Sequence, residues 1–189
     1  MTETAPYADL AASAVEELRG AVMRVDGEAV ARFADTILSA RRIALYGVGR
    51  EGLMMRALAM RLYHLGLDAH VVGDMSAPPL GQGDLLIVSA GPGDFSTVAA
   101  LVGVASRDGA VTACVTAQPD GPVPAACDTV LHLPAQTMAD DQAPTTSVLP
   151  MGSLYEGAQY LAFECLVLIL RQKSGTSPDA MRARHTNLE

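Results

Sequence analysis

The sequence predicts an α/β protein in which a parallel sheet of five strands lies between two layers of helices, a three-layer α/β/α sandwich. Short apolar segments alternate with longer segments of helical periodicity from Ile43 onward. The short segments do not alternate apolar with polar residues, which is typical of strands buried on both faces of a parallel sheet. The chain has 189 residues, half of them hydrophobic, and one domain usually has roughly 100–200 residues. We therefore expect a single domain over residues 1–189.

Two leading helices are expected within residues 1–40, because apolar residues recur there at four-residue spacing on both sides of Gly27. The α/β core is expected over residues 41–173. Residues 174–189 are expected to form a C-terminal tail, in which Pro178 suits the first turn of a short helix.

Within the core, short apolar runs bounded by glycines or polar turns mark the strands. Strands are predicted over residues 42–46, 68–72, 85–88, 110–115 and 128–133. Helices are predicted over residues 50–64, 94–107 and 152–173, with a helical turn over 123–126 and a polar loop over 134–150.

The most apolar stretch, Leu154 to Leu170, carries Glu156, Gln159 and Glu164. A membrane span needs about 20 mostly apolar residues, so this stretch is predicted to be a buried helix and no membrane anchor. The chain has 13 basic and 21 acidic residues and a formal net charge of −8. An acidic surface repels nucleic-acid phosphates and anionic lipids, so we expect neither a nucleic-acid nor a membrane partner.

Three cysteines, Cys114, Cys127 and Cys165, lie among apolar neighbours without CxxC spacing. Buried, inert thiols in a reducing compartment are expected, and no metal site. The N-terminal segment lacks the basic patch and apolar run of a signal peptide, so we expect a cytoplasmic protein.

A first glycine-rich turn, Gly47-Val48-Gly49-Arg50-Glu51-Gly52, follows the first predicted strand and matches GxGxxG. Asp74 follows the second strand, where an acidic residue would bind the ribose of a dinucleotide. Alternatively, the glycines only allow a tight turn into the next helix. Arg50 within the turn suits a small anionic ligand as well as a pyrophosphate.

A second glycine-rich turn runs from Ser89 to Thr97, at the start of another helix. Helix N-termini hold anions, and a phosphosugar site would use such a turn. Alternatively, Asp94 caps the helix, and its charge occupies the field that a phosphate requires. The candidate substrate-binding residues of the two turns are Gly47, Gly49, Arg50, Gly91, Gly93, Asp94, Ser96 and Thr97.

A third feature, Met151-Gly152-Ser153-Leu154-Tyr155-Glu156, begins the long helix. Glu156 there suits a general base that removes a proton from a carbon beside a carbonyl. Alternatively, Ser153 and Glu156 form a capping box. A catalytic Glu156 needs a partner for the enediolate oxygens, and His185 or His64 could donate that hydrogen bond. This chemistry requires neither a metal nor an organic cofactor.

These segments, taken together, resemble the sugar isomerase (SIS) fold and, within it, the 6-phospho-3-hexuloisomerase family. The resemblance runs nearly end to end and is carried by residues 47–50, 59–66, 71–78, 151–156 and 184–189. It implies the SIS fold with flavodoxin-like strand order and an aldose–ketose isomerase that acts on a sugar phosphate through an enediol. It also implies a homo-oligomer, a tetramer or a dimer, in which the tail with His185 reaches a neighbouring subunit's site.

The second turn departs from the family's pattern, Ser-Gly-Ser-Gly-Glu-Thr, whose hydroxyls bind the substrate phosphate. Its three hydroxyl positions are occupied here by Ala90, Pro92 and Phe95, and the serine expected after Arg50 is Glu51. We therefore expect weaker phosphate affinity than in a typical member. Two alternatives to an isomerase remain: a non-catalytic sugar-binding or regulatory protein, and a nucleotide-binding protein that uses the first turn.

Overall fold

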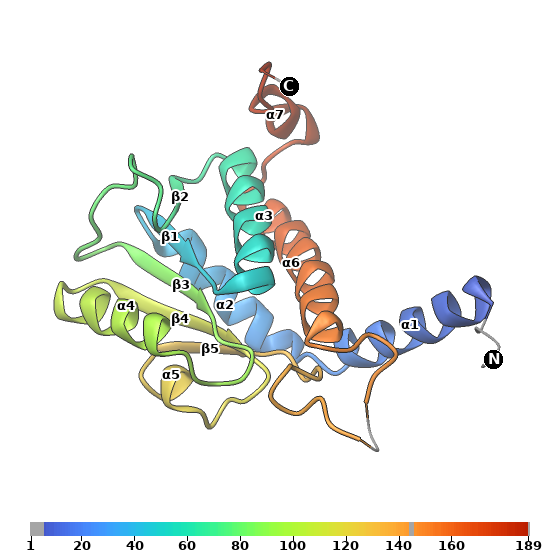
Figure 1. Cartoon of the computed structure of the whole chain (residues 1–189). Coiled ribbons are helices and arrows are strands. Elements are labelled where there is room, and N and C mark those ends of the chain that lie inside the picture. The colour runs from blue at the N-terminus through green and yellow to red at the C-terminus, as the bar shows by residue number, and fades with distance from the viewer. Residues whose placement is uncertain (1–5, 144–145, 189) are drawn as a thin grey trace.

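Five strands form one parallel sheet in the order β2-β1-β3-β4-β5 (Figure 1). The computed structural model describes residues 6–143 and 146–188. The strands are β1 (Ile43–Tyr46), β2 (Ala69–Val71), β3 (Leu85–Ser89), β4 (Val111–Thr116) and β5 (Thr129–His132). Strand β1 lies between β2 and β3 and pairs Ile43 with Ala69 of β2 on one side and with Leu85 of β3 on the other. The predicted five-stranded parallel sheet and its flavodoxin-like order are confirmed.

Seven helices surround or extend this sheet within the described residues, and each predicted helix is present. They are α1 (Tyr7–Val22), α2 (Gly27–Ser39), α3 (Gly49–Leu65), α4 (Ser96–Arg107), α5 (Pro122–Ala125), α6 (Ser153–Ser174) and α7 (Pro178–Ala183). The tail helix α7 begins as predicted, with the Ser177 hydroxyl accepting the Ala180 N–H at 3.1 Å. Glu189, the last residue of the family-like ending, lies outside the described residues.

Alternate residues of the strands face two separate apolar layers. Leu45 and Ile87 face a layer built with α2, α3 and α6, while Leu86 and Val88 face the layer built with α4 and α5. All four side chains are nearly inaccessible to solvent. Burial on both faces explains why these strands are continuously apolar in the sequence.

Helix α6 is the one helix among the described residues that is long and apolar enough to cross a membrane. It packs against α1, α2 and α3, and Leu166 and Val167 are buried in the core, as the sequence predicted for a buried helix. Helices α1 and α7 extend beyond the three layers at two separate ends of the molecule (Figure 1).

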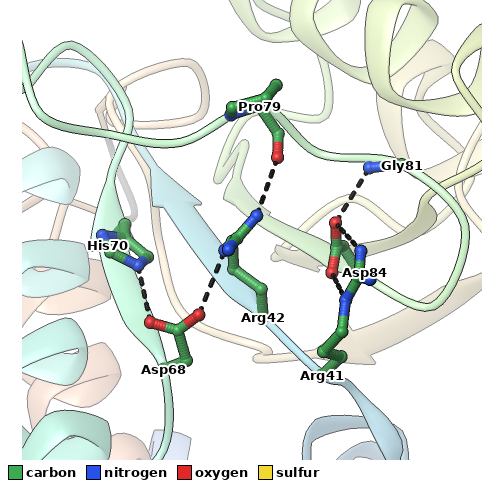
Figure 2. A network of polar contacts seen from close by, with 7 residues as sticks. All are labelled: Arg41, Arg42, Asp68, His70, Pro79, Gly81 and Asp84. Carbon is green, nitrogen blue, oxygen red and sulfur yellow. Dashed lines mark hydrogen bonds and ion pairs between the residues drawn. The ribbon is translucent and has the colours of Figure 1, made fainter.

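Ion pairs connect the starts of three neighbouring strands at the edge of the sheet opposite the glycine-rich turns. Figure 2 shows Arg41 bound to the buried Asp84 through two bonds, at 3.0 and 3.1 Å. Arg42 binds Asp68 at 3.0 Å, and His70 lies 2.8 Å from the same carboxylate. These contacts join β1 to the residues that precede β3 and β2, and they give His70 a structural role.

Candidate active site

A cavity of about 590 Å³ lies where the carboxyl ends of β1 and β3 meet. The connections after these two strands leave in opposite directions, because β2 lies on one side of β1 and β4 lies beyond β3. Such a switch point is where ligands bind in open parallel sheets. The cavity is lined by residues 48–51, Pro92, Phe95, residues 137–139, residues 150–153, Tyr155 and Glu156.

The first glycine-rich turn approaches its own helix closely enough to require glycine. A Cβ on Gly47 would lie 2.9 Å from the backbone nitrogen of Gly52. Gly49 begins α3 with φ +58°, in the left-handed region that favours glycine. This tight turn places the next two residues, Arg50 and Glu51, at the cavity wall.

Arg50 connects the first turn to the start of α6. Its Nε lies 2.9 Å from Oε2 of Glu156, and its Nη1 donates to the Ser153 hydroxyl at 2.9 Å. Its Nη2 donates to the Met151 carbonyl. Burial raises the pKa of Glu156 above its ordinary value, and the charge of Arg50 opposes that rise. A half-buried carboxylate with a raised pKa suits a general base.

The predicted capping box at the start of α6 is not formed. The N-cap is Gly152, with φ +82°, and no side chain caps the helix. Ser153 is already the first helical residue, and both Ser153 and Glu156 face Arg50 instead. Met151 has φ 57°, the one positive value at a non-glycine residue in the described chain, and such local strain is typical of functional sites.

A buried polar cluster forms the floor of the cavity around Glu51, whose exposed fraction is 8%. Its Oε2 accepts the Ser89 hydroxyl at 2.5 Å and the Gly91 N–H at 3.0 Å. Gln159 donates to Ser89 at 2.9 Å, and the Tyr155 hydroxyl lies 3.4 Å from the same oxygen. Burial raises the pKa of Glu51 despite the two hydrogen bonds, which lower it.

Sequence reasoning missed this cluster as a unit. The sequence marks Glu51 only as the residue in place of the serine expected after Arg50, and neither Tyr155 nor Gln159 is among the predicted site residues. A signal for the cluster is present in the sequence: Tyr155 and Gln159 are four residues apart, which places a phenol and an amide on one face of an otherwise apolar helix.

The second glycine-rich turn contributes less to the cavity than predicted. Gly91 lies directly under Glu51, because a Cβ on Gly91 would lie 2.8 Å from the carboxylate oxygen Oε1. The Gly93 N–H donates to the Ala90 carbonyl within the turn at 2.8 Å. Asp94, Ser96 and Thr97 are exposed, and none of the three lines the cavity. Asp94 does not cap α4, whose N-cap is Phe95 without a side-chain cap bond.

His64 and His185 lie together, but at the opposite end of α3 from the cavity. Their rings stack with centroids 5.4 Å apart, and Arg184 donates to the His64 carbonyl at 3.1 Å. At 1.5 Å per residue, His64 is about 20 Å along the helix axis from Arg50. Within one chain, Glu156 therefore contacts Arg50 and His185 contacts His64, but the two histidines lie far from Glu156.

No group of three or more metal-ligating side chains occurs among the residues that the structure describes. Asp74, which the sequence suggested for ribose binding, forms an ion pair with Arg56 at 3.5 Å.

The expectation of three buried thiols is wrong for one of them: Cys114 is buried and Cys127 half-buried, but Cys165 is exposed on α6. A helix has an outer face even when its average composition is apolar.

The chain is similar to known proteins over most of its length. A family model described as SIS domain matches residues 36–158. A 3-hexulose-6-phosphate isomerase from Bacillus subtilis is 32% identical and covers 94% of this chain and 96% of the relative. A protein of the same name from Mycobacterium gastri is 35% identical, with coverages of 92% and 87%. These similarities confirm the resemblance predicted from the motifs.

Among solved structures, a protein from Methanococcus jannaschii superposes with a TM-score of 0.80 at 24% identity. The superposition covers 96% of this chain and 98% of that chain, which shows a shared fold. That structure is described as inferring a molecular function of 3-hexulose-6-phosphate isomerase.

Proposed function

The chain belongs to the SIS domain family, and from this premise we propose that it is a sugar-phosphate isomerase that acts on a 3-hexulose 6-phosphate. The observation that carries the proposal is the contact between Arg50 and Glu156 at the cavity wall. It provides a base and a cation within one concave site at the carboxyl ends of the strands.

Glu156 is the proposed base. Moving the carbonyl of a 3-hexulose from C3 to C2 requires removal of a proton from C2 and addition of a proton to C3. Glu156 takes the C2 proton, the electron pair forms the C2–C3 double bond of an enediolate, and the same carboxyl returns a proton to C3. The hydroxyl proton on O2 passes to O3. Arg50 stabilises the negative charge that develops on the enediolate oxygens.

We further propose a cytoplasmic homo-oligomer, a tetramer or a dimer, in which His64 and His185 of one subunit approach the cavity of another. Several large apolar side chains are exposed on the helices, more than isolated surface positions require. They are Leu53, Met60 and Tyr63 on α3, and Tyr160, Leu161 and Leu168 on α6. The ligand is a sugar phosphate, without a nucleic-acid or membrane partner.

A second candidate, a sugar-binding protein without turnover, is favoured by one observation: Glu51 already occupies the Gly91 N–H of the second turn. The assay that separates the two functions follows 3-hexulose 6-phosphate in deuterated water. An isomerase produces a 2-hexulose 6-phosphate that carries solvent deuterium at C3, because the carboxyl of Glu156 exchanges protons with solvent. A binding protein leaves the substrate and its hydrogens unchanged.

A further inference from the structure

The Glu51 carboxylate lies where an anionic ligand of the second glycine-rich turn would lie. It comes from the first turn of α3, crosses to the end of β3 and accepts the N–H of Gly91 at 3.0 Å. The hydroxyl of Ser89, the last residue of β3, binds the same oxygen. Two neutral donors of the turn are thus already bound to a carboxylate of the chain itself.

Residues 90–93 of this turn have no unbonded backbone N–H to offer a second anion. Pro92 has no N–H. The N–H groups of Ala90 and Gly93 donate to the carbonyls of Val115 and Ala90, at 3.0 and 2.8 Å. A phosphate that approaches residues 90–93 therefore meets the Glu51 carboxylate and no available N–H.

The charges that face Glu51 do not compensate for it. The Glu156 carboxylate faces it from α6, and the pKa of Glu156 is raised by burial and also by the negative charge of Glu51. The Tyr155 hydroxyl of α6 and the Cys114 thiol of β4 also face it, but both are neutral and supply no positive charge. Arg50, which precedes it on α3, is bound to Glu156, Ser153 and Met151. Among the cavity-lining residues of the described chain, the charged side chains are Arg50, Glu51 and Glu156. Two carboxylates therefore share one cation, which disfavours a phosphate dianion.

Protonation of Glu51 would remove this conflict without breaking its hydrogen bonds. Both hydrogen bonds described for Glu51 fall on Oε2, and Oε1 accepts none among the described residues. A proton on Oε1 would leave Oε2 as the acceptor from Ser89 and Gly91, and would make Oε1–H a donor to the ligand. A buried carboxyl kept neutral in this way can hold an anion instead of repelling it.

We propose that Glu51 is a specificity-determining residue of the isomerase: its carboxylate competes as an internal anion for the second turn, and a sugar phosphate binds together with one proton that neutralises Glu51. This inference rests on the proposed function, because that function requires a sugar phosphate in this cavity. It accounts for a turn that lacks the three hydroxyl positions, Ala90, Pro92 and Phe95, yet belongs to a chain similar to sugar-phosphate isomerases.

The test measures binding of fructose 6-phosphate to the whole chain by titration calorimetry between pH 5 and pH 9. Wild type is compared with Glu51→Gln, a neutral side chain of nearly the same shape. The ratio of the wild-type Kd to the Glu51→Gln Kd cancels the ionisation of the phosphate. We expect this ratio to rise with pH, up to about tenfold per pH unit once free Glu51 is ionised, with Glu51→Gln the tighter binder. A ratio that stays at one throughout overturns the proposal.

A second measurement needs no variant. Titrations at pH 8 in buffers of different ionisation enthalpy measure the number of protons taken up on binding. Binding of fructose 6-phosphate to wild type is expected to take up about one proton more than binding of fructose does. Equal proton uptake for the two sugars overturns the proposal.

The control for Glu51→Gln is Glu28→Gln, a matched change at an exposed glutamate of α2, which is expected to bind fructose 6-phosphate like wild type. Proton-linked binding without isomerisation of 3-hexulose 6-phosphate would support the role of Glu51 and contradict the proposed catalysis.

Discussion

The guanidinium of Arg50 and the carboxylate of Glu156 lie 2.9 Å apart, although 105 positions separate the two residues in the chain. Arg50 belongs to the first turn of α3, which follows β1, and Glu156 to the first turn of α6. Both helices begin at the carboxyl edge of the sheet, so their N-terminal turns face the same cavity. This contact is the basis of the catalytic proposal and of the first two predictions.

Glu156→Gln is expected to lower kcat about 10²–10⁴-fold, because an amide cannot take the proton from carbon. The melting temperature should change little, since Glu156 does not cap α6. Isomerase assays and thermal denaturation of the same preparation check both parts. Glu164→Gln, on the same helix but paired with Arg61, is the matched control. Turnover by Glu156→Gln at the wild-type rate would assign the base elsewhere.

Arg50→Lys is expected to lower kcat/KM about 10–100-fold, because one ammonium cannot reproduce contacts to Glu156, Ser153 and Met151 that are worth roughly 1.5–3 kcal/mol when charge-assisted. The Arg50 charge lowers the pKa of Glu156. Arg50→Met removes that charge, so the acid limb of the pH–rate profile should move to higher pH. Arg56→Lys, whose ion pair with Asp74 is about half exposed, is the control. An unmoved acid limb in Arg50→Met would separate Arg50 from the ionisation of the base.

Stability should depend on pH through Glu51, whose pKa is raised by burial. Between the ordinary pKa and the raised one, the folded chain holds a proton that the unfolded chain has lost. The free energy of unfolding therefore falls as pH rises through this interval. Glu51→Gln removes the effect, so its melting temperature relative to wild type should be higher at pH 8 than at pH 5. A difference that is independent of pH would show that Glu51 ionises as it does in the unfolded chain.

Asp84→Asn is expected to reduce the free energy of unfolding by about 1 kcal/mol, since the buried Asp84 side chain loses the charge that accepts hydrogen bonds from the exposed Arg41 and from the Gly81 N–H. Arg41 lowers the pKa of Asp84, so the wild-type contribution is present at neutral pH and is lost as pH falls through that lowered pKa. Urea denaturation at pH 7 measures the loss. Asp68→Asn, at a half-exposed carboxylate, should cost less, and an equal cost would indicate that burial is not the cause.

The proposed oligomer is tested by complementation. If His185 acts in a neighbouring subunit's cavity, Glu156→Gln and His185→Ala are each poorly active. Mixed oligomers of the two should then regain activity, because some cavities combine an intact Glu156 with an intact His185. Refolded or coexpressed mixtures are assayed beside each single variant, and light scattering measures the mass. A monomer at micromolar concentration, or mixtures no more active than the two variants averaged, would contradict the shared site.

Most of the fold was predictable from the sequence because it rests on local signals. Strand β3 is apolar at four consecutive positions, Leu85 to Val88, since both faces of a parallel strand are buried. Gly66 ends α3 in the left-handed conformation that only glycine adopts easily. The two glycine-rich turns were found for the same reason: each directly follows a strand, and parallel strands bring their carboxyl ends to one edge.

Part of the site could not be predicted, because it depends on contacts between residues far apart in the chain. The pattern Ser153-x-x-Glu156 has the spacing of a capping box, but Arg50 supplies a charged partner from another helix, and this long-range pair replaces the local one. Likewise, His64 and His185 were each considered beside Glu156, whereas the length of α3 holds them at its other end.

By itself, the sequence determined which segments are strands and helices and which edge of the sheet carries the two glycine-rich turns, and it made Arg50 and Glu156 candidates for the site at that edge. These features follow from periodicity, from glycine positions and from the direction of parallel strands. Only the tertiary structure decided what Glu51 does. Its carboxylate reaches Ser89 and Gly91 because α3 and β3 are adjacent, and it stays there because Tyr155 and Gln159 of α6 close the cluster from the other side. Because three separate segments bury it there, that carboxylate competes with an anionic ligand for the second turn, and no local sequence pattern encodes such burial.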